Sequence, residues 1–408
     1  MSDQRSTSPA ADDERERVSG RGPSRPAAGQ ERSSERGLSR PAADDERERV
    51  SGRGLLLPVV DGVITPARIA ATVDAIAEVQ LPDGMIPWFP GGHADPWNHI
   101  EAAMALALGG RRAEAERAYE WLVASQRPDG AWHQYYLADG IEESKLDANV
   151  CAYVAAGTWH HYLLTGDAGF LDVMWPVVEA AIDFVLGLQT PRGEILWARH
   201  DDGTPWSFAL LTGSSSICHS LRCAIAIAEH LGHERPDWEL SAAQLAHVIA
   251  HVPDAFEPKA RWAMDWYYPV MAGVVVEDAG RARLREGWDT FIMEDKGTRC
   301  VSDRPWITAA ETCECVLAHL VVGEAERALE LFQWIQHLQA DDGGWMTGIV
   351  YPELKHFPGG ERSTYTAAAV VLAADALSGT SPASWLFTDH TALPELLDPA
   401  EPAVDPAD

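Results

Sequence analysis

The stretch YEWLVASQRPDGAW (119–132) carries the strongest fold signal in this chain. Its apolar helical run ends at Gln126, and a charged turn containing Gly130 leads to Trp132. The same succession of Gln, a turn, Gly and Trp recurs as QLPDGMIPW (80–88), QTPRGEILW (189–197) and QADDGGW (339–345). Each copy follows an amphipathic helical pattern, so the repetition indicates one large domain built from helical hairpins.

The repeated turn has a physical reason in its glycine. Helices commonly end where a glycine adopts a positive φ, because glycine has no Cβ to hinder that conformation. The motif therefore predicts a reversal of the chain after each helix, and the Trp that follows is expected to cover the helix end. We interpret the copies as connections from outer helices to inner helices.

The helical segments between residues 60 and 380 fall into two classes. One class has charged faces, as in FLDVMWPVVEAAIDFVLGLQ (170–189), and the other is rich in small residues, as in STYTAAAVVLAADAL (363–377). Small side chains let helix axes approach closely, which suits an inner ring surrounded by the charged class. The alternation predicts an all-α (α/α)6 toroid, or six-hairpin barrel, over residues 56–385.

Both flanks of this domain differ from it in composition. Residues 1–55 are polar and contain PAADDERERVSGRG twice, at 9–22 and at 41–54. A segment of this composition buries too little apolar surface to order itself, so we expect a disordered, internally duplicated tail. Residues 386–408 are acidic and rich in proline, and we expect a second loose tail there.

Charge and cysteine content limit the partners and the compartment. The formal net charge of −30 argues against nucleic acid as a partner, because phosphate binding needs clustered Lys and Arg. No apolar run reaches the length of about 18 residues that a membrane span needs, and the first residues show no secretory signal. The 6 Cys form no close pairs. We therefore expect a cytoplasmic protein without membrane insertion. The oligomeric state stays open.

The connections that lead into the inner helices are polar and aromatic, and a closed ring gathers them at one end. Carboxylates bind sugar hydroxyl groups and indole faces stack on sugar C–H surfaces, so this end predicts a cleft for an oligosaccharide or another small molecule. The abundance of Trp, 16 against 9 Phe, supports the same interpretation. The residues expected to bind substrate are Trp97, Asp147, Trp206, Trp266, Tyr267, Trp306, Arg362 and Tyr365.

Two resemblances refine the interpretation. YEWLVASQRPDGAW and FQWIQHLQADDGGW resemble the QW motif of squalene–hopene cyclases and of the related protein prenyltransferase toroids. The segment from KLDANV to GEILW (145–197) is similar to six-hairpin glycosidases of the glucoamylase type, with their Asp-Ala opening, TGD turn and WP helix. AMDWYYPVMAG (263–273) looks like part of an actinobacterial family labelled prenyltransferase. These motifs are specific for the toroid and much less so for the reaction.

The glycosidase resemblance implies a pair of catalytic carboxyl groups, one acting as acid and one as base. The acid is implied in the region ILWARHDDG (195–203), where Ala198 stands in place of the expected Glu. Asp201 or Asp202 could substitute from the same loop, and Asp202 is our candidate. The base is implied before the last inner helix, where the sequence offers Glu353 or Glu361, and Glu361 is our candidate. Asp265, flanked by aromatic residues that would raise its pKa, is an alternative acid.

Two other classes of function compete with hydrolysis. A prenyltransferase or terpene cyclase would act on an isoprenoid, but the DxDD acid motif is missing, and Glu311 stands where the zinc-binding helix would carry His. A toroid could also bind a glycan without turning it over. The leading expectation is a glycosidase-like enzyme that acts by inversion and needs neither a metal nor another cofactor.

Overall fold

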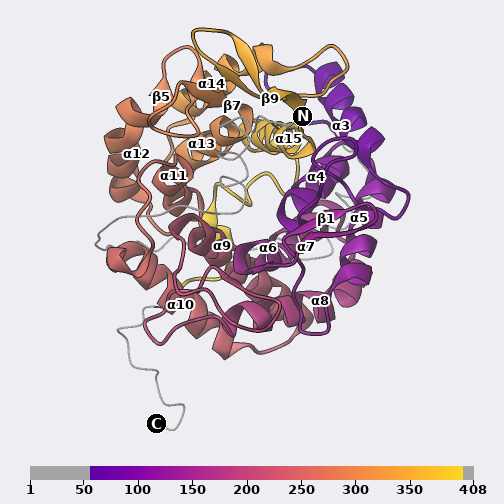
Figure 1. The fold of residues 1–408 in the computed structure, drawn as a ribbon, viewed down its shortest axis with the longest axis vertical. Coiled ribbons are helices and arrows are strands. Elements are labelled where there is room, and N and C mark those ends of the chain that lie inside the picture. The colour runs from indigo at the N-terminus through magenta and orange to yellow at the C-terminus, as the bar shows by residue number, and fades with distance from the viewer. Residues whose placement is uncertain (1–55, 398–408) are drawn as a thin grey trace, which may run out of the picture.

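The computed structural model describes residues 56–397, which close into a ring of six helical hairpins (Figure 1). The outer helices are α3 (Pro66–Val79), α5 (Arg112–Ser125), α8 (Ala168–Leu186), α10 (Pro236–His251), α12 (Glu277–Phe291) and α14 (Ala325–Trp334). The inner helices are α4 (Pro96–Leu108), α6 (Ala148–Ala152) with α7 (Val154–Thr165), α9 (Leu211–Leu231), α11 (Met264–Met271), α13 (Ala309–Val321) and α15 (Thr364–Ser378). The predicted (α/α)6 toroid is confirmed.

The inner helices form a continuous ring. Each packs on the next in the order α4, α7, α9, α11, α13, α15, and α15 packs back on α4. Close approach depends on small residues, as expected. A Cβ added to Gly157 on α7 would overlap Ile100 on α4, and the Tyr119 hydroxyl donates to the Gly157 carbonyl oxygen at 2.8 Å. The small-residue class of segments therefore forms the inner wall.

The repeated Gln joins neighbouring hairpins. The Nε2 atom of Gln126 donates to the carbonyl oxygen of Gly130 in its own turn and to that of Val177 on the next outer helix, both at 2.9 Å. Gln80 and Gln189 make the same pair of bonds in their hairpins. Gln339 donates to the carbonyl oxygen of Arg68 at 3.1 Å. Because Arg68 lies on α3, this last bond connects the final hairpin to the first.

The glycine of each motif lies against the same neighbouring helix. Gly130 has φ +85°, and a Cβ built on it would overlap the carbonyl oxygen of Ala180 on α8. Gly84 and Gly343 approach the carbonyl oxygens of Arg117 and Ala71 in the same way. Glycine is thus required at these positions for two reasons: it adopts the positive φ, and it permits the close contact between hairpins. The turn reverses the chain, as expected, and also connects adjacent outer helices.

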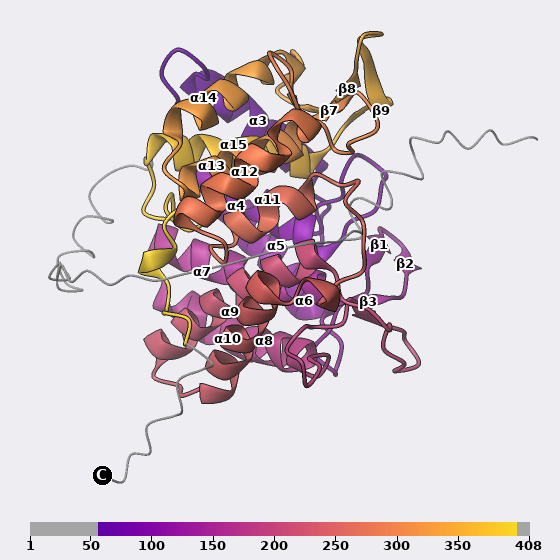
Figure 2. The same cartoon turned by 90° about the vertical axis from the view of Figure 1, so that its left-hand side faces the viewer.

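Short strands cover one end of the ring (Figure 2). Three sheets have two strands each: β1 (Tyr135–Leu137) with β2 (Gly140–Glu143), β3 (Leu146–Asp147) with β4 (Ala198–Arg199), and β5 (Ile292–Met293) with β6 (Gly297–Thr298). The fourth contains β7 (Trp306–Thr308), β8 (Met346–Val350) and β9 (Lys355–Arg362) in that order, all antiparallel. The sequence patterns did not predict these strands. They lie in the connections that enter the inner helices.

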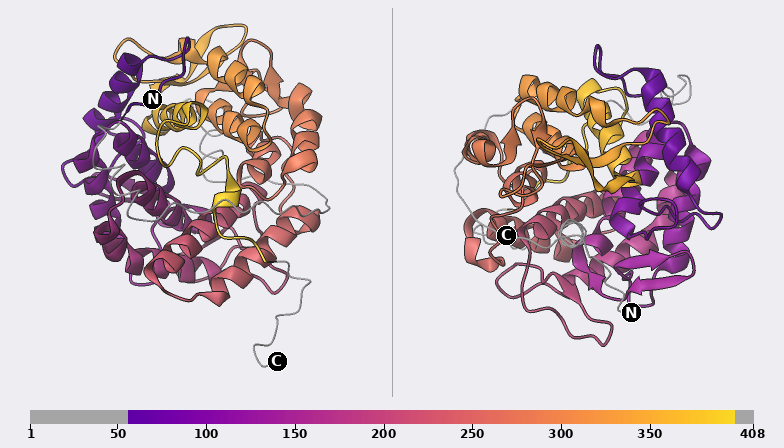
Figure 3. Two further views of the ribbon diagram at one scale, coloured as in Figure 1. Left: turned by 180° about the vertical axis from the view of Figure 1, so that it is seen from behind. Right: turned by 45° about the horizontal axis from the view of Figure 1, so that its top comes forward.

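The opposite end is crossed by the C-terminal segment that follows α15 (Figure 3). Arg222 on α9 donates to the carbonyl oxygens of His390 and Pro394, and the ring of Phe387 packs on His219. The packed domain therefore extends beyond the expected boundary at residue 385, because apolar residues such as Leu386 and Leu393 are buried there. The expected disorder of residues 1–55 lies outside the described range, and so does that of 398–408.

Residues 56–397 contain no helix with the length and apolar character that crossing a bilayer requires. This finding concerns the described part of the chain.

Substituting the motif Gln should weaken the ring. Gln126→Ala removes both bonds to the turn and to α8, and we expect the free energy of unfolding to fall by about 1–3 kcal/mol. Urea unfolding followed by circular dichroism measures the change. Gln244→Ala, on an exposed face of α10, is the matched control and should have little effect. Equal stability of the two variants would contradict a connecting role for Gln126.

Candidate active site

Acidic side chains gather where the inner helices begin. Asp95 and Asp147 are the N-caps of α4 and α6, whereas Asp265 and Glu311 lie in the first turns of α11 and α13. Every inner helix follows an outer one, so the inner helices all begin at the end of the ring that the strands cover (Figure 2). Carboxylates are favoured at helix N-termini by the helix dipole. The ring thus concentrates four carboxyl groups at one end.

A small cavity, called here the axial cavity, lies among the first turns of four inner helices. Its volume is about 30 Å³, and it is lined by Trp97, Asn98, Glu101, Met264, Ala310, Glu311, Glu314, Tyr365 and Ala369. The sequence predicts that two of these lining residues, Trp97 and Tyr365, bind substrate. Glu311 is buried at this cavity, with 2% of its surface exposed. Two larger hollows lie outside the inner ring, along α8 and between α12 and α14.

Two more carboxyl groups line the cavity one helical turn deeper. Glu101 Oε1 accepts hydrogen bonds from Trp97 Nε1 at 3.0 Å and from the Tyr153 hydroxyl at 3.2 Å. Glu314 accepts from the hydroxyls of Tyr267 and Tyr268. Glu101 lines the cavity and is partly exposed. Burial raises the pKa of Glu101 well above its usual value, and the nearby Glu314 raises it further.

Asp265 combines burial with an open hydrogen-bonding position. Its Oδ1 accepts from the hydroxyl of Thr212 at 2.6 Å and from the Thr212 backbone N–H at 3.3 Å. Its Oδ2 has no hydrogen-bond partner among the described residues. Burial raises the pKa of Asp265 to about 8, even though Thr212 and Arg283 act in the opposite direction. The group is therefore largely protonated at neutral pH, the state that a general acid needs.

Two Trp residues of the repeated motif bind carboxyl groups at the inner-helix starts. Trp88 Nε1 donates to Asp95 Oδ2 at 2.8 Å, and Trp197 Nε1 donates to Asp147 Oδ2. Burial raises the pKa of Asp147 to about 6. The other two Trp residues serve the fold, since Trp132 donates to the carbonyl oxygen of Leu122 and Trp345 to the Thr72 hydroxyl. Covering helix ends is thus one of two roles for these rings.

Asp202 and Glu361 do not line the cavity. Asp202 is fully exposed in the turn after β4, where its side chain accepts from the Thr204 backbone N–H at 2.9 Å. Hydrogen bonds from Thr204 lower its pKa, which suits a carboxylate and not an acid. Glu361 lies on β9 and accepts from the Thr347 hydroxyl at 3.1 Å. Ala198, which replaces the Glu of the resemblance, pairs directly with Asp147 between β3 and β4.

The remaining aromatic candidates occupy different surroundings. Trp266 points toward the outer ring, where its Nε1 donates to the Arg283 carbonyl oxygen and its ring stacks on Phe291. Trp306 packs on Phe357 in the sheet of β7 to β9. Trp206 packs on Trp197 and His200 in the loop after β4. Trp306 and Trp206 belong to the covered end, whereas Trp266 supports the contact between α11 and α12.

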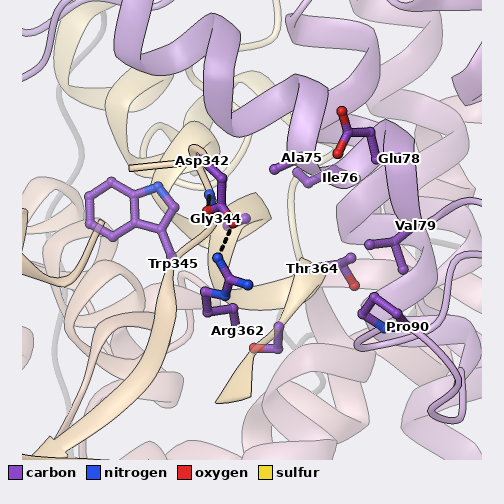
Figure 4. A pocket seen from close by; sticks show the side chains of 12 residues that line it. Ala75, Ile76, Glu78, Val79, Pro90, Asp342, Gly344, Trp345, Arg362 and Thr364 are labelled. Carbon is purple, nitrogen blue, oxygen red and sulfur yellow. Dashed lines mark hydrogen bonds and ion pairs between the residues drawn. The ribbon is translucent and has the colours of Figure 1, made fainter. Parts of the chain in front are cut away.

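Arg362 lies in a separate cavity where the last hairpin meets the first. This cavity measures about 220 Å³ and is lined by residues of α3, including Ala75, Glu78 and Val79, and by residues 362–364. Figure 4 shows Arg362 and Asp342 directed toward each other, and they form an ion pair. Tyr365, one residue beyond this lining, contributes to the axial cavity instead. The structure therefore divides Arg362 and Tyr365 between two cavities.

A zinc site of the prenyltransferase kind could recruit Cys313, His219 or Asp303 as ligands, and these residues are dispersed. Burial raises the pKa of Cys313 on α13 well above its usual value, which disfavours a thiolate. His219 packs at the opposite end of the ring, and Asp303 pairs with Arg261 at 2.9 Å. Within residues 56–397 no three His, Cys, Asp or Glu side chains are arranged to hold a metal ion.

The sequence analysis missed Glu101 and Glu314 and gave Glu311 no role in hydrolysis. A signal for them exists, because each acidic residue interrupts a segment of small, apolar residues: NHIEAAMALALGG (98–110) and TAAETCECVLAHLVVG (308–323). Glu311 and Glu314 are three residues apart, which places them on one helix face. An acidic residue on the inner face of an inner helix is costly to bury without a function.

Replacing Asp265 should change how stability depends on pH. Folding raises the pKa of Asp265 from 3.8 to about 8. The contribution of its protonated form to native-state stability is therefore fully present when the pH is below the unfolded-state pKa of 3.8. That contribution declines as the pH rises and is lost beyond the higher value. Urea unfolding at several pH values should therefore show Asp265→Asn gaining on the wild type by at least about 1.4 kcal/mol from acid to alkaline pH, the equivalent of one pKa unit. The exposed Asp202→Asn variant serves as control, and an identical trend for both variants would contradict the assignment.

Comparison with known proteins agrees with this geometry. No family model matches the chain. It is 49% identical over 331 residues to the MMP endo-(1,4)-3-O-methyl-α-D-mannosidase of Mycolicibacterium hassiacum, an alignment that covers 81% of this chain and 92% of the relative. An uncharacterized glycosyl hydrolase of Methanocaldococcus jannaschii is 31% identical over 86 residues, which cover 20% of this chain and 14% of that protein.

Solved structures share the fold at low identity. A glycosidase superposes with a TM-score of 0.61 at 13% identity, covering 78% of this chain and 98% of the other. The GH63 mannosylglycerate hydrolase of Thermus thermophilus gives 0.56 at 11% identity, covering 75% and 99% of the two chains. The cellobiose 2-epimerase of Spirochaeta thermophila gives 0.56 at 13%, covering 77% and 96%. Carboxyl groups gathered at one end of a six-hairpin ring, together with 49% identity to the mannosidase, show that this chain belongs to the family of that endo-mannosidase and is a glycosidase-like, carbohydrate-active enzyme.

Proposed function

We propose that the chain is an endo-acting hydrolase of 1,4-linked 3-O-methyl-α-D-mannosides. The observation that carries the proposal is the identity of 49% across 92% of a relative with that activity in its name. The inner-helix starts support it, because Glu311, Trp97 and Tyr365 place a carboxyl group beside aromatic surfaces on which a sugar ring can stack.

The proposed catalytic pair is Asp265 as acid and Glu311 as base. The protonated Asp265 donates its proton to the glycosidic oxygen while the bond from that oxygen to the anomeric carbon breaks. Glu311 accepts a proton from the attacking water, whose oxygen forms the new bond to the anomeric carbon. Both groups exchange their protons with solvent before the next cycle. This assignment keeps Asp265 from the sequence analysis and replaces Glu361 by a carboxyl group that lines the cavity.

The cytoplasmic location predicted from the sequence is part of the proposal. All six Cys side chains are buried, as suits a protein that folds in a reducing compartment. An oligosaccharide substrate in the same compartment fits the acidic chain, because a neutral glycan requires no clustered positive charge.

Incubation with 1,4-linked oligosaccharides of 3-O-methylmannose tests the activity directly. Mass spectrometry should show internal cleavage into shorter oligosaccharides and not release of single sugars from one end. Proton NMR of the first products should show the β-anomer, since one displacement at the anomeric carbon inverts the configuration. Binding without cleavage would favour the non-catalytic interpretation, and an initial α-anomer would contradict inversion.

Substitutions test the catalytic pair. Asp265→Asn and Glu311→Gln should each lower kcat by about 10²–10⁴-fold, the usual contribution of a positioned acid or base, while both variants stay folded at neutral pH. Asp202→Asn and Glu361→Gln test the residues that the sequence resemblance implies. Near wild-type turnover is expected for both, because Asp202 is fully exposed in a surface turn and Glu361 lies on β9, where it accepts a hydrogen bond from Thr347.

Two further variants keep the assignment of the acid falsifiable. Asp95→Asn and Asp147→Asn retain the shape of the helix caps and remove their charge. Loss of turnover in one of these folded variants, with activity retained in Asp265→Asn, would transfer the acid role to that residue. Loss in Glu361→Gln with activity retained in Glu311→Gln would reassign the base in the same way.

A further inference from the structure

The axial cavity is too small for a sugar ring. A cavity needs about 10–15 Å³ on this scale to hold one water molecule, so about 30 Å³ admits a group of about two non-hydrogen atoms. A methoxyl substituent has two such atoms, one oxygen and one carbon. A ring placed at the inner-helix starts, beside Glu311, would reach this space with a substituent only.

The cavity wall has an apolar part that matches a methyl group. Met264, Ala310 and Ala369 line it, together with the rings of Trp97 and Tyr365. Ala310 and Ala369 keep 9% and 8% of their surface exposed, whereas the adjacent Ala309 and Ala368 keep 0%. The first two alanines therefore leave space where a larger side chain would fill it.

The opposite side of the cavity presents Glu101. Its Oε1 accepts two hydrogen bonds, and its Oε2 makes none with the residues of the described chain. Burial and the neighbouring Glu314 raise its pKa well above the usual value, which favours the protonated form, and the hydroxyl of that form can donate. An ether oxygen has lone pairs but no hydrogen, and a donor is therefore the group that it needs as partner.

We propose that the axial cavity is the subsite for the 3-methoxyl substituent, with Glu101 donating to the ether oxygen and Ala310, Ala369 and Met264 contacting the methyl group. This inference rests on the proposed function and adds the structural basis of its specificity. Glu101 and both alanines are specificity-determining residues in this scheme, whereas Asp265 and Glu311 carry out the cleavage.

An unmethylated sugar fits the same site less well. Its 3-hydroxyl would leave the apolar wall uncovered and lose the contact of one methyl group. A difference of one carbon atom in a hydrophobic pocket changes kcat/KM by about 10–200-fold. The ratio of kcat/KM for methylated and unmethylated oligosaccharides, called here the methyl preference, is thus the quantity to measure.

Filling the cavity should lower the methyl preference. Ala369→Val and Ala310→Val add two carbon atoms where the methyl group would lie, and we expect each to reduce the methyl preference at least about 10-fold. Matched 1,4-linked oligosaccharides with and without 3-O-methyl groups are the substrates. Ala376→Val is the control, because Ala376 lies near the C-terminal end of α15 and outside the cavity lining. This variant should retain the wild-type methyl preference. If Ala369→Val fails to fold, Ala310→Val on α13 carries the test.

Glu101 is tested by a pair of substitutions of similar size. Glu101→Gln keeps a donor, and its methyl preference should stay within about 3-fold of the wild type. Glu101→Met removes the donor, and the methyl preference should fall about 10-fold or more, the cost of leaving a buried polar atom without its partner. A residue that merely supports packing would not separate Gln from Met in this ratio.

The outcomes distinguish the two levels of the proposal. A wild type that cleaves both substrates equally, or cavity-filling variants with unchanged methyl preference, would overturn the methoxyl subsite and leave the proposed hydrolase intact. A wild type that cleaves neither substrate would overturn the hydrolase, and the subsite with it. A preference of about 10-fold or more that Ala369→Val or Ala310→Val removes would support both.

Discussion

Hydrogen bonds from four glutamines join neighbouring outer helices of the ring. Each side-chain amide of Gln80, Gln126, Gln189 and Gln339 donates within its own turn and to the backbone of the neighbouring outer helix. The adjacent glycines have no Cβ, which permits the contact that these bonds require. Because Gln339 reaches Arg68 on α3, the same interaction that links successive hairpins also closes the ring, and the site exists only when the ring is closed.

Closure of the ring brings the beginnings of separate inner helices together into one site. Asp95, Asp147, Asp265 and Glu311 are far apart in the chain, yet each lies at the beginning of an inner helix. Two of the repeated motifs also contribute directly, since Trp88 and Trp197 bind the carboxyl groups of Asp95 and Asp147. The unit that joins outer helices therefore also orients acidic groups at the covered end, which couples the stability of the ring to the geometry of the site.

The inner ring places carboxyl groups in surroundings that separate their properties. Asp202 is in water and keeps a lowered pKa, whereas Asp265, excluded from water, has a pKa of about 8. Deeper in the barrel, burial and the neighbouring Glu314 raise the pKa of Glu101 well above its usual value. Carboxyl groups that favour protonation and carboxyl groups that favour ionisation thus coexist at the covered end of the ring, a combination that acid–base chemistry on a sugar requires.

Sequence patterns alone were enough to predict the fold class and the inner and outer helices. They also predicted the end of the ring where polar residues gather. These predictions were possible because helical periodicity, small residues and the Gln–Gly–Trp turn are local features. The patterns also singled out Trp97 and Tyr365, which line the axial cavity, and Asp265, which is buried at the start of α11. Which carboxyl groups are buried together was settled by packing in three dimensions. Glu101, Glu311 and Glu314 meet only when α4 and α13 approach the same axis, and the exposure that separates Asp202 from Asp265 depends on that packing, which no local pattern records.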